Sequence, residues 1–346
     1  MTRVLVSLLA LLTVVATAAE PANQTRCTSG TLAALPYAEG GTHGSACAGR
    51  FSELREIPFT FAVLSLFASR SHYPFEKAPL AHGQLEVAQI SVTGRLTVER
   101  VRFWSDEMNE PRFFLALVPK PPARLTDAFI LNHGWFDRPE DLLTYLKVDE
   151  VYDAMLARGE LRPAVVVIPD VRFKKFYRLN SARTPFPNYL TLEAEEIAGI
   201  VSQRYKIPFE RDRWSVGGFS FGGYASLDIG RRYPGRFASV SVISGLVDPR
   251  WSFWPARPSA SGTGDFRGRN RNTVVVPGPI PRLFLACGTD DRLYRTMQRL
   301  HHTLDAIGIP YTWSSAPGGH TWKYWSSVIP PMLKFSLGTD QPVATR

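Results

Sequence analysis

Apolar and polar positions from about residue 84 onward follow two strand patterns. Residues 96–103 alternate between apolar and polar, as in a half-buried strand, and residues 112–118 predict a second strand after a turn at 108–111. Later runs are short and continuously apolar, which is typical of parallel strands buried on both faces. These runs lie at residues 128–131, 164–168, 213–216, 238–243 and 282–286, and a last strand is expected at 311–314.

Helical patterns lie between these runs, at residues 142–157, 190–205, 224–233, 296–307 and 325–335. The alternation of strand and helix predicts an α/β fold, with a mostly parallel sheet, an antiparallel pair at its start and helices on both faces. Two longer irregular stretches, 172–188 and 248–281, are expected to lie over the strand ends, because long loops in a compact domain are usually functional.

The first nineteen residues predict a secretory signal peptide. Arg3 precedes an apolar run at 4–15, and small residues follow at 16–19, so cleavage is expected after Ala18 or Ala19. The run is too short to span a bilayer comfortably, so no stable membrane insertion is expected after cleavage. The sequence therefore predicts a secreted or periplasmic protein.

The remaining chain divides into an N-terminal appendage at 20–85 with no assigned chemistry, a main domain at 86–338 and a tail at 339–346. Export permits disulfides. The close pair Cys27 and Cys47 is expected to form one, with Cys287 buried and reduced; the alternative is three free thiols.

The composition is that of an ordinary globular protein with a positive net charge. Hydrophobic residues make up 45% and charged residues 21%, and 40 Lys and Arg against 31 Asp and Glu give a net charge of +9. Such a charge can favour anionic partners. The basic residues are scattered, however, and their densest group at 267–271 is interleaved with Gly and Asn, as in a solvated loop. No nucleic-acid motif is present, and no nucleic-acid partner is expected.

Ser220 is the candidate nucleophile. The stretch 218–223 reads Gly-Phe-Ser-Phe-Gly-Gly, directly after the strand at 213–216 and before the helix at 224–233. A G-x-S-x-G sequence in a sharp strand-to-helix turn exposes the serine hydroxyl at a helix N-terminus, where negative charge is favoured. The alternative is a glycine-rich turn with a solvent-facing serine.

A serine nucleophile needs a base and an orienting carboxylate. His320 follows the last strand and is the expected base, while His301 and His302 are expected on a helix surface. Asp291 ends a Gly-Thr-Asp-Asp stretch after the strand at 282–286, which gives the chain order Ser, Asp, His. From the residues alone, Asp290 and Asp248 remain possible acids.

The developing oxyanion needs two backbone donors. One is expected from Phe221, the residue after the nucleophile, and the other from Trp135 in the loop after the first parallel strand, with Phe136 as the alternative. Gly134 lets that loop approach the substrate, and His133 is expected to hold the loop.

These motifs together resemble the putative-esterase family of α/β-hydrolases, which includes feruloyl, acetyl, tributyrin and enterochelin esterases and secreted mycolyltransferases. The resemblance covers about residues 90–338. Its markers are LNHGW (131–135), VVVIPD (165–170), GGFSFGGYASL (217–227), RRYPGRFASVSVISG (231–245), CGTDD (287–291) and GGHTWKYW (318–325).

The resemblance implies an α/β-hydrolase fold and a serine carboxylic-ester hydrolase, with Ser220 as nucleophile, Asp291 as acid and His320 as base. It implies no metal and no organic cofactor, and the sequence shows no cluster with metal-ligand spacing. The substrate would be a small-molecule or carbohydrate-linked ester. The alternatives are acyl transfer to a sugar hydroxyl and a non-catalytic binding protein on the same fold; a peptidase has only the shared triad in its favour. The appendage has no counterpart in the family and the loop at 248–281 is long and basic, so both leave the substrate open.

Overall fold

The computed structural model describes residues 80–135, 137–170, 186–247, 279–306 and 308–340, all within the compact unit Ile57–Arg346. Cys27, Cys47, Phe136 and Asp248 lie outside the described residues, as do the expected signal peptide and most of the appendage. Cys287 is buried and forms no disulfide, as the sequence predicts.

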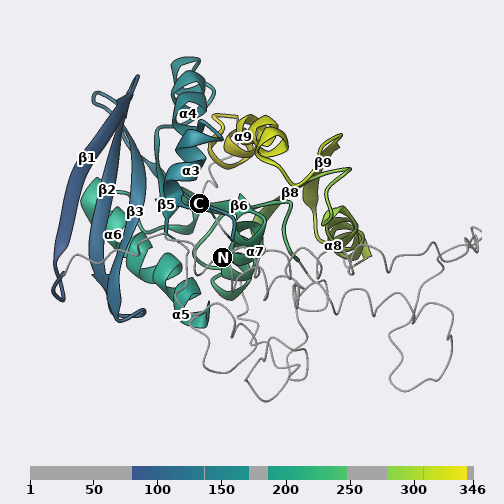
Figure 1. Ribbon diagram of the computed structural model, residues 1–346, viewed down its shortest axis with the longest axis horizontal. Helices are drawn as coiled ribbons and strands as arrows, with labels where there is room; N and C mark the ends of the chain where they lie inside the picture. The colour runs from purple at the N-terminus through teal and green to yellow at the C-terminus, as the bar shows by residue number, and fades with distance from the viewer. Residues whose placement is uncertain (1–79, 136, 171–185, 248–278, 307, 341–346) are drawn as a thin grey trace, which may run out of the picture. The chain divides into compact units, whose positions relative to one another are not determined.

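A nine-stranded sheet forms the centre of the described part of the chain (Figure 1). Its order is β1-β2-β3-β5-β4-β6-β7-β8-β9, antiparallel from β1 to β5 and parallel beyond. The strands are β1 (Leu85–Thr93), β2 (Leu96–Ser105), β3 (Glu110–Pro119), β4 (Asp127–Asn132), β5 (Ala164–Pro169), β6 (Trp214–Phe219), β7 (Ser239–Ile243), β8 (Arg282–Gly288) and β9 (Tyr311–Ala316). Every residue of β4, β5, β6 and β7 is buried, which explains why these strands are short and mainly apolar.

The antiparallel start contains three strands, β1, β2 and β3, whereas the sequence predicts only the pair that corresponds to β2 and β3. The pairing of β1 with β2 is irregular between Gln89 and Ser91. Such a bulge shifts the alternation by one residue. Leu85 and Val87 therefore lie at odd positions whereas Ile90 and Val92 lie at even ones, and the sequence shows no continuous strand pattern.

Helices connect the strands, with two departures from the predicted pattern. The expected helix at 142–157 is divided by Lys147, whose φ of 52° is left-handed, and the expected helix at 190–205 contains a π-helical segment, η3. The helical elements are α3 (Pro139–Thr144), α4 (Val148–Ala157), α5 (Phe186–Thr191), η3 (Leu192–Ile197), α6 (Ala198–Tyr205), the 3₁₀ turn η4 (Arg211–Arg213), α7 (Phe221–Arg232), α8 (Tyr294–Ala306) and α9 (Trp322–Leu337).

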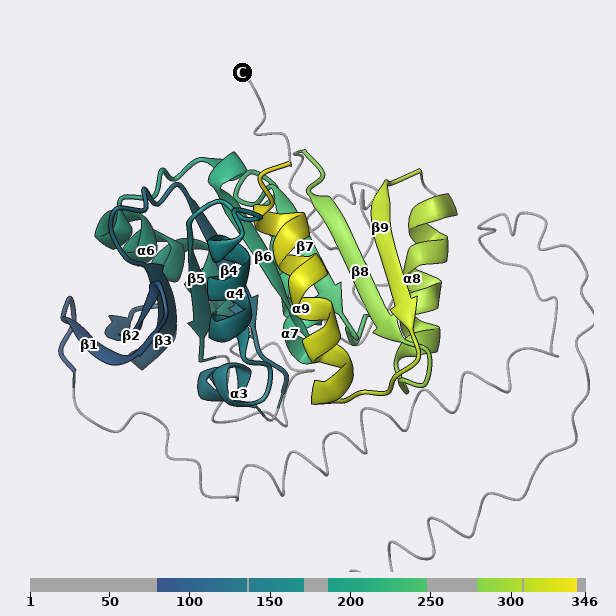
Figure 2. The same cartoon turned by 90° about the horizontal axis from the view of Figure 1, so that it is seen from above.

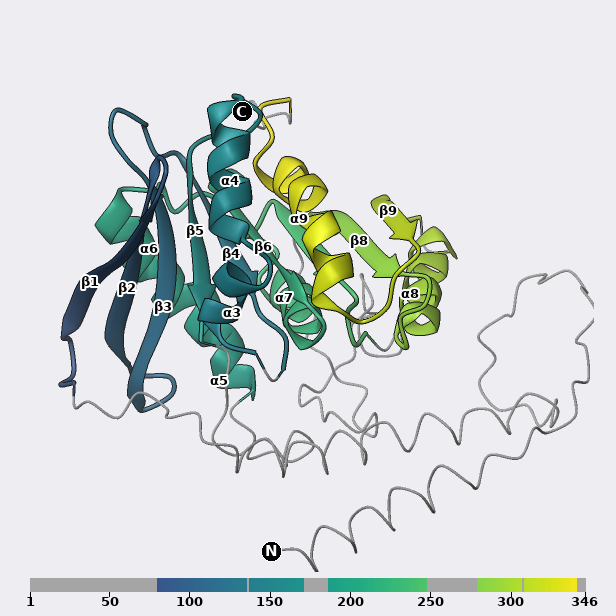
Figure 3. The ribbon, with the colours of Figure 1, turned by 45° about the horizontal axis from the view of Figure 1, so that its top comes forward.

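The helices cover both faces of the sheet (Figures 2 and 3). The buried apolar side chains form two separate cores. On one face α3, α4 and α9 pack their apolar side chains against the sheet, with Tyr152 and Ile329 among the buried residues. On the other face α5, η3, α6, α7 and α8 do so, with Tyr189, Leu227 and Leu300 buried. The predicted α/β fold with helices on both faces is confirmed.

The connections around β4 define where a site can form. Helices α3 and α4 connect β4 to β5 over one face, and α5, η3 and α6 connect β5 to β6 over the other face. The strand order therefore reverses at β4, which lies between β5 and β6. Loops at the carboxyl ends of neighbouring strands separate at such a point and leave a crevice for ligands.

Candidate active site

Ser220 lies between the end of β6 and the start of α7, in a strained turn. Its φ of 54° and ψ of −116° are uncommon for a residue other than glycine. Its backbone N–H donates to the Ile243 carbonyl at 2.8 Å, which fixes the turn to the neighbouring strand β7. Close packing against the loop that begins at His133 after β4 (the β4 loop) also supports the turn. A Cβ on Gly222 would lie 2.4 Å from the His133 carbonyl oxygen. The sharp turn predicted from the sequence is therefore present.

His320 brings the ends of three strands together. Its Nε2 lies 3.0 Å from Ser220 Oγ, and its Nδ1 lies 3.0 Å and 2.9 Å from the two carboxylate oxygens of Asp291. The His320 ring also packs edge-on against Trp325, with centroids 4.9 Å apart. This geometry suits an imidazole that donates from Nδ1 to the carboxylate and accepts the serine proton at Nε2.

Asp291 is a buried carboxylate that its partners keep ionised. Burial alone would raise its pKa, but hydrogen bonds from His320 and from the Leu293 backbone N–H hold the pKa below its usual value. Asp290 lies on the exposed side of the same turn and accepts a hydrogen bond from the Gly318 N–H at 3.2 Å. Of these two adjacent carboxylates, the structure therefore brings Asp291 to the histidine.

The β4 loop lies against the start of α7. His133 is fully buried, its Nδ1 lies 2.6 Å from the Gly134 carbonyl and its Nε2 lies 3.9 Å from Asp170, in keeping with the predicted loop-holding role. The Trp135 and Phe221 rings meet edge to face, with centroids 4.9 Å apart. The two residues that the sequence predicts as oxyanion donors thus lie on segments packed against each other.

Glu193, which the sequence did not single out, supports the β4 loop through a hydrogen bond to Asn132 at the end of β4. It lies in the π-helical segment η3, is completely buried, and accepts a hydrogen bond from Asn132 Nδ2 at 2.8 Å. Asn132 Nδ2 also donates to Ser226 at 3.2 Å, and Ser226 donates to the Gly222 carbonyl at 2.7 Å. Burial raises the pKa of Glu193 to about 8, although hydrogen bonds from Asn132 and Tyr189 lower it. One buried hydrogen-bond network therefore connects η3, β4 and the first two turns of α7, the helix that begins after Ser220.

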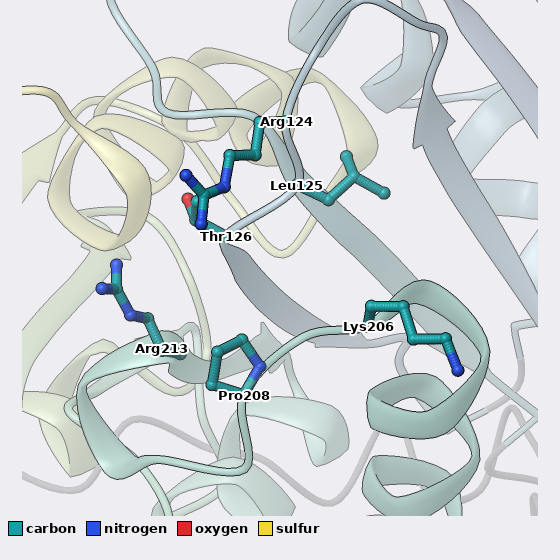
Figure 4. A pocket seen from close by; sticks show the side chains of 6 residues that line it. All are labelled: Arg124, Leu125, Thr126, Lys206, Pro208 and Arg213. Atoms are coloured by element: carbon teal, nitrogen blue, oxygen red, sulfur yellow. The ribbon is translucent and has the colours of Figure 1, made fainter.

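Other candidate binding features lie away from Ser220. The expectation of no metal-ligand cluster needs correction, because one turn of α8 brings His301, His302 and Asp305 together with ligating atoms within 4.8 Å of one another. At the amino ends of the parallel strands, a cavity of about 120 Å³ is lined by basic side chains and their neighbours (Figure 4). Its lining consists of Arg124, Leu125, Thr126, Lys206, Pro208 and Arg213. Within the described part of the chain, no helix has the length and apolarity needed to cross a membrane.

Comparison with known proteins places these motifs in a family. A family model described as Putative esterase matches residues 105–336. An acetyl esterase of Caldicellulosiruptor saccharolyticus is 22% identical over 264 residues, covering 68% of this chain and 96% of that protein. An esterase of Mycobacterium tuberculosis is 25% identical over 208 residues, covering 51% of this chain and 44% of its own length.

The solved structure of a ferulic acid esterase from Anaeromyces mucronatus, in complex with ferulic acid, superposes with a TM-score of 0.54. The two chains are 18% identical, and the match covers 76% of this chain and 96% of the other. This likeness shows that the fold is shared, as the resemblance implied.

Proposed function

The chain belongs to the putative-esterase family and is a carboxylic ester hydrolase, and we propose that it acts through an acyl intermediate on Ser220. The observation that carries this proposal is the continuous hydrogen-bonded series from Ser220 through His320 to Asp291, with contacts of 3.0 Å and 2.9 Å. All three side chains follow the carboxyl ends of parallel strands, Ser220 after β6, Asp291 after β8 and His320 after β9, so they share one edge of the sheet.

In the first half of the reaction, Ser220 Oγ attacks the ester carbonyl carbon while His320 Nε2 takes the hydroxyl proton. The carbonyl electron pair moves onto oxygen, where the backbone N–H groups of Phe221 and Trp135 stabilise it. The intermediate then collapses, the bond from carbon to the alcohol oxygen breaks, and His320 returns the proton to the leaving alcohol. Asp291 stabilises the imidazolium throughout.

In the second half, water attacks the acyl carbon of the Ser220 ester and His320 accepts its proton. Collapse releases the carboxylic acid and restores the serine hydroxyl. The related acetyl esterase and the ferulic acid complex support acetyl and aromatic acyl esters as the substrate class. The N-terminal signal pattern supports export as the setting of this reaction.

A fluorophosphonate probe tests the nucleophile. The wild-type protein should become labelled and should hydrolyse acetyl and feruloyl esters. Ser220→Ala should be unlabelled and should lose turnover by a factor of roughly 10⁴ or more. A folded wild-type protein that stays unlabelled and inactive on both esters would overturn the proposal.

A further inference from the structure

A carboxyl group that the triad does not use lies beside the nucleophile. Asp137 follows the β4 loop, and its backbone N–H donates to the Gly134 carbonyl at 3.3 Å, which folds the chain back over that loop. A Cβ placed on Gly134 would lie 2.4 Å from Asp137 Oδ2 and 3.6 Å from Ser220 Cβ. The carboxyl group and the nucleophile therefore both lie next to the position that a side chain on Gly134 would take.

The surroundings of this carboxyl group leave it able to bind a hydrogen-bond donor. Burial raises the pKa of Asp137 to about 6, the negative charge of Asp141 adds to the rise, and the Gly134 backbone N–H lowers it. A carboxylate accepts through two oxygens with about four lone-pair positions, so one backbone N–H does not use its full capacity. At neutral pH Asp137 is thus mainly an ionised acceptor near the reacting carbon.

We propose that Asp137 is a specificity-determining residue, which accepts a hydrogen bond from a substrate hydroxyl that lies within two carbons of the scissile ester group. A hydroxyl can bind Asp137 in both protonation states, because it donates to the carboxylate and can accept from the carboxylic acid. Hydroxylated esters, such as those of polyols or of hydroxy acids, are then preferred over simple alkyl esters. The inference rests on the proposed function, since it assumes that the ester binds at Ser220.

Two pairs of esters of nearly equal size test the preference. One pair places the hydroxyl on the alcohol side, as 2-hydroxyethyl acetate against propyl acetate. The other places it on the acyl side, as propyl glycolate against propyl propionate. In each pair the readout is kcat/KM for the hydroxylated ester divided by kcat/KM for the alkyl ester. Comparing this ratio between variants removes the intrinsic reactivity of the esters and any general damage to the enzyme.

We expect Asp137→Ala to lower this ratio about tenfold in at least one pair, because a site built to hold a hydroxyl discriminates against its absence. The affected pair identifies which side of the ester carries the hydroxyl. Asp137→Asn keeps a neutral acceptor of the same size and should lower the ratio less, and it serves as the test if the alanine variant does not fold. Asp141→Asn removes the neighbouring carboxylate and should leave the ratio near the wild-type value.

Unchanged ratios in both pairs for Asp137→Ala, or for Asp137→Asn where the alanine variant does not fold, would overturn the specificity role while leaving the esterase mechanism intact. An equal fall of the ratio in Asp141→Asn would overturn it too, because the effect would then come from general charge. A wild-type protein that hydrolyses none of the four esters and is not labelled at Ser220 would overturn the proposed function together with this inference.

Discussion

At the scale of single residues, the acid of the triad can be tested against its neighbour. Asp291 contacts His320 Nδ1 with both oxygens, whereas Asp290 contacts the Gly318 backbone. Asp291→Asn should lower kcat about 10³- to 10⁴-fold, because the amide no longer stabilises the imidazolium or selects its tautomer. Asp290→Asn should stay within about tenfold of wild type, as expected for an exposed turn residue. Steady-state kinetics on one acetyl ester compares the two, and a larger loss in the Asp290 variant would contradict this assignment.

Glu193 makes the stability of the fold depend on pH. Its pKa is about 8 in the folded protein against an ordinary value of 4.5, so the folded state holds the proton more tightly. Unfolding therefore becomes easier as the pH rises from about 4.5 to about 8, and the penalty is constant above that range. Glu193→Gln keeps the size and the acceptor for Asn132 without the titration. Its Tm should rise relative to wild type as the pH increases, by the equivalent of about 5 kcal/mol at pH 9.

Thermal unfolding of both proteins at several pH values measures this effect. Glu195→Gln is the matched control, since Glu195 lies on the same segment but forms an ion pair with Arg236 at 2.7 Å on a partly exposed surface. Its Tm should differ little from wild type, because such a partly exposed pair contributes at most about 1 kcal/mol. A Tm difference for Glu193→Gln that does not change with pH would show that Glu193 is already charged in the folded protein.

The members of the proposed triad could be picked out from the sequence because each lies in a recognisable local motif. Ser220 has its glycines, and His320 and Asp291 follow strands in the expected order. Glu193 and Asp137 have no such sign. Glu193 reaches Asn132 only because a π-helical segment changes the phase of its helix, and Asp137 reaches the site only because the chain folds back over Gly134.

At the scale of elements, the contact between α7 and the β4 loop decides whether the site can assemble. A Cβ on Gly222 would lie 2.4 Å and 2.5 Å from the backbone carbonyl oxygens of His133 and Asn132, which cannot rotate away as side chains do. Gly222→Ala should therefore separate the two segments, lower the stability by at least about 2 kcal/mol and remove most activity. Gly235→Ala is the control, since no atom lies within 4 Å of its added Cβ. Equal Tm and activity in the two variants would contradict this view of the contact.

Helices and strands could be predicted where the degree of burial is the same along the whole segment. The buried strand β5 at 164–169 is continuously apolar and was recognised directly. Strand β1 was missed because its bulge shifts the alternation, and the break between α3 and α4 was missed because Lys147 has no sequence feature that requires a left-handed residue. Tertiary packing overrides local propensity at such positions.

At the scale of the whole molecule, the order of strands could not be read from the sequence, because the alternation of strand and helix permits several orders of parallel strands. The amino edge of the sheet shows what the order brings together. Asp127, at the start of β4, is buried and lies 3.4 Å from Arg162 at the start of β5 and 3.9 Å from Arg213 at the start of β6. Arg162 also donates to the Gly338 carbonyl after α9, so one carboxylate helps to connect strands and the terminal helix.

Removing this carboxylate should destabilise the entire unit. Burial lowers the pKa of Arg282, and the nearby positive charges of Arg162 and Arg211 lower it further. Asp127→Ala should therefore cost about 3 kcal/mol, as expected when a buried ion pair loses one partner. Added salt should restore part of the lost Tm, because it screens the remaining repulsion.

Asp212→Ala is the matched control, since Asp212 pairs with Arg211 at 3.6 Å on the partly exposed surface of the same edge. A pair of this kind contributes at most about 1 kcal/mol. Thermal unfolding of both variants at low and high salt compares them with wild type. Equal losses of Tm in the two variants would show that the edge is held by apolar packing alone, whereas a larger and salt-sensitive loss for Asp127→Ala would show that the shared carboxylate stabilises the strand order around β4.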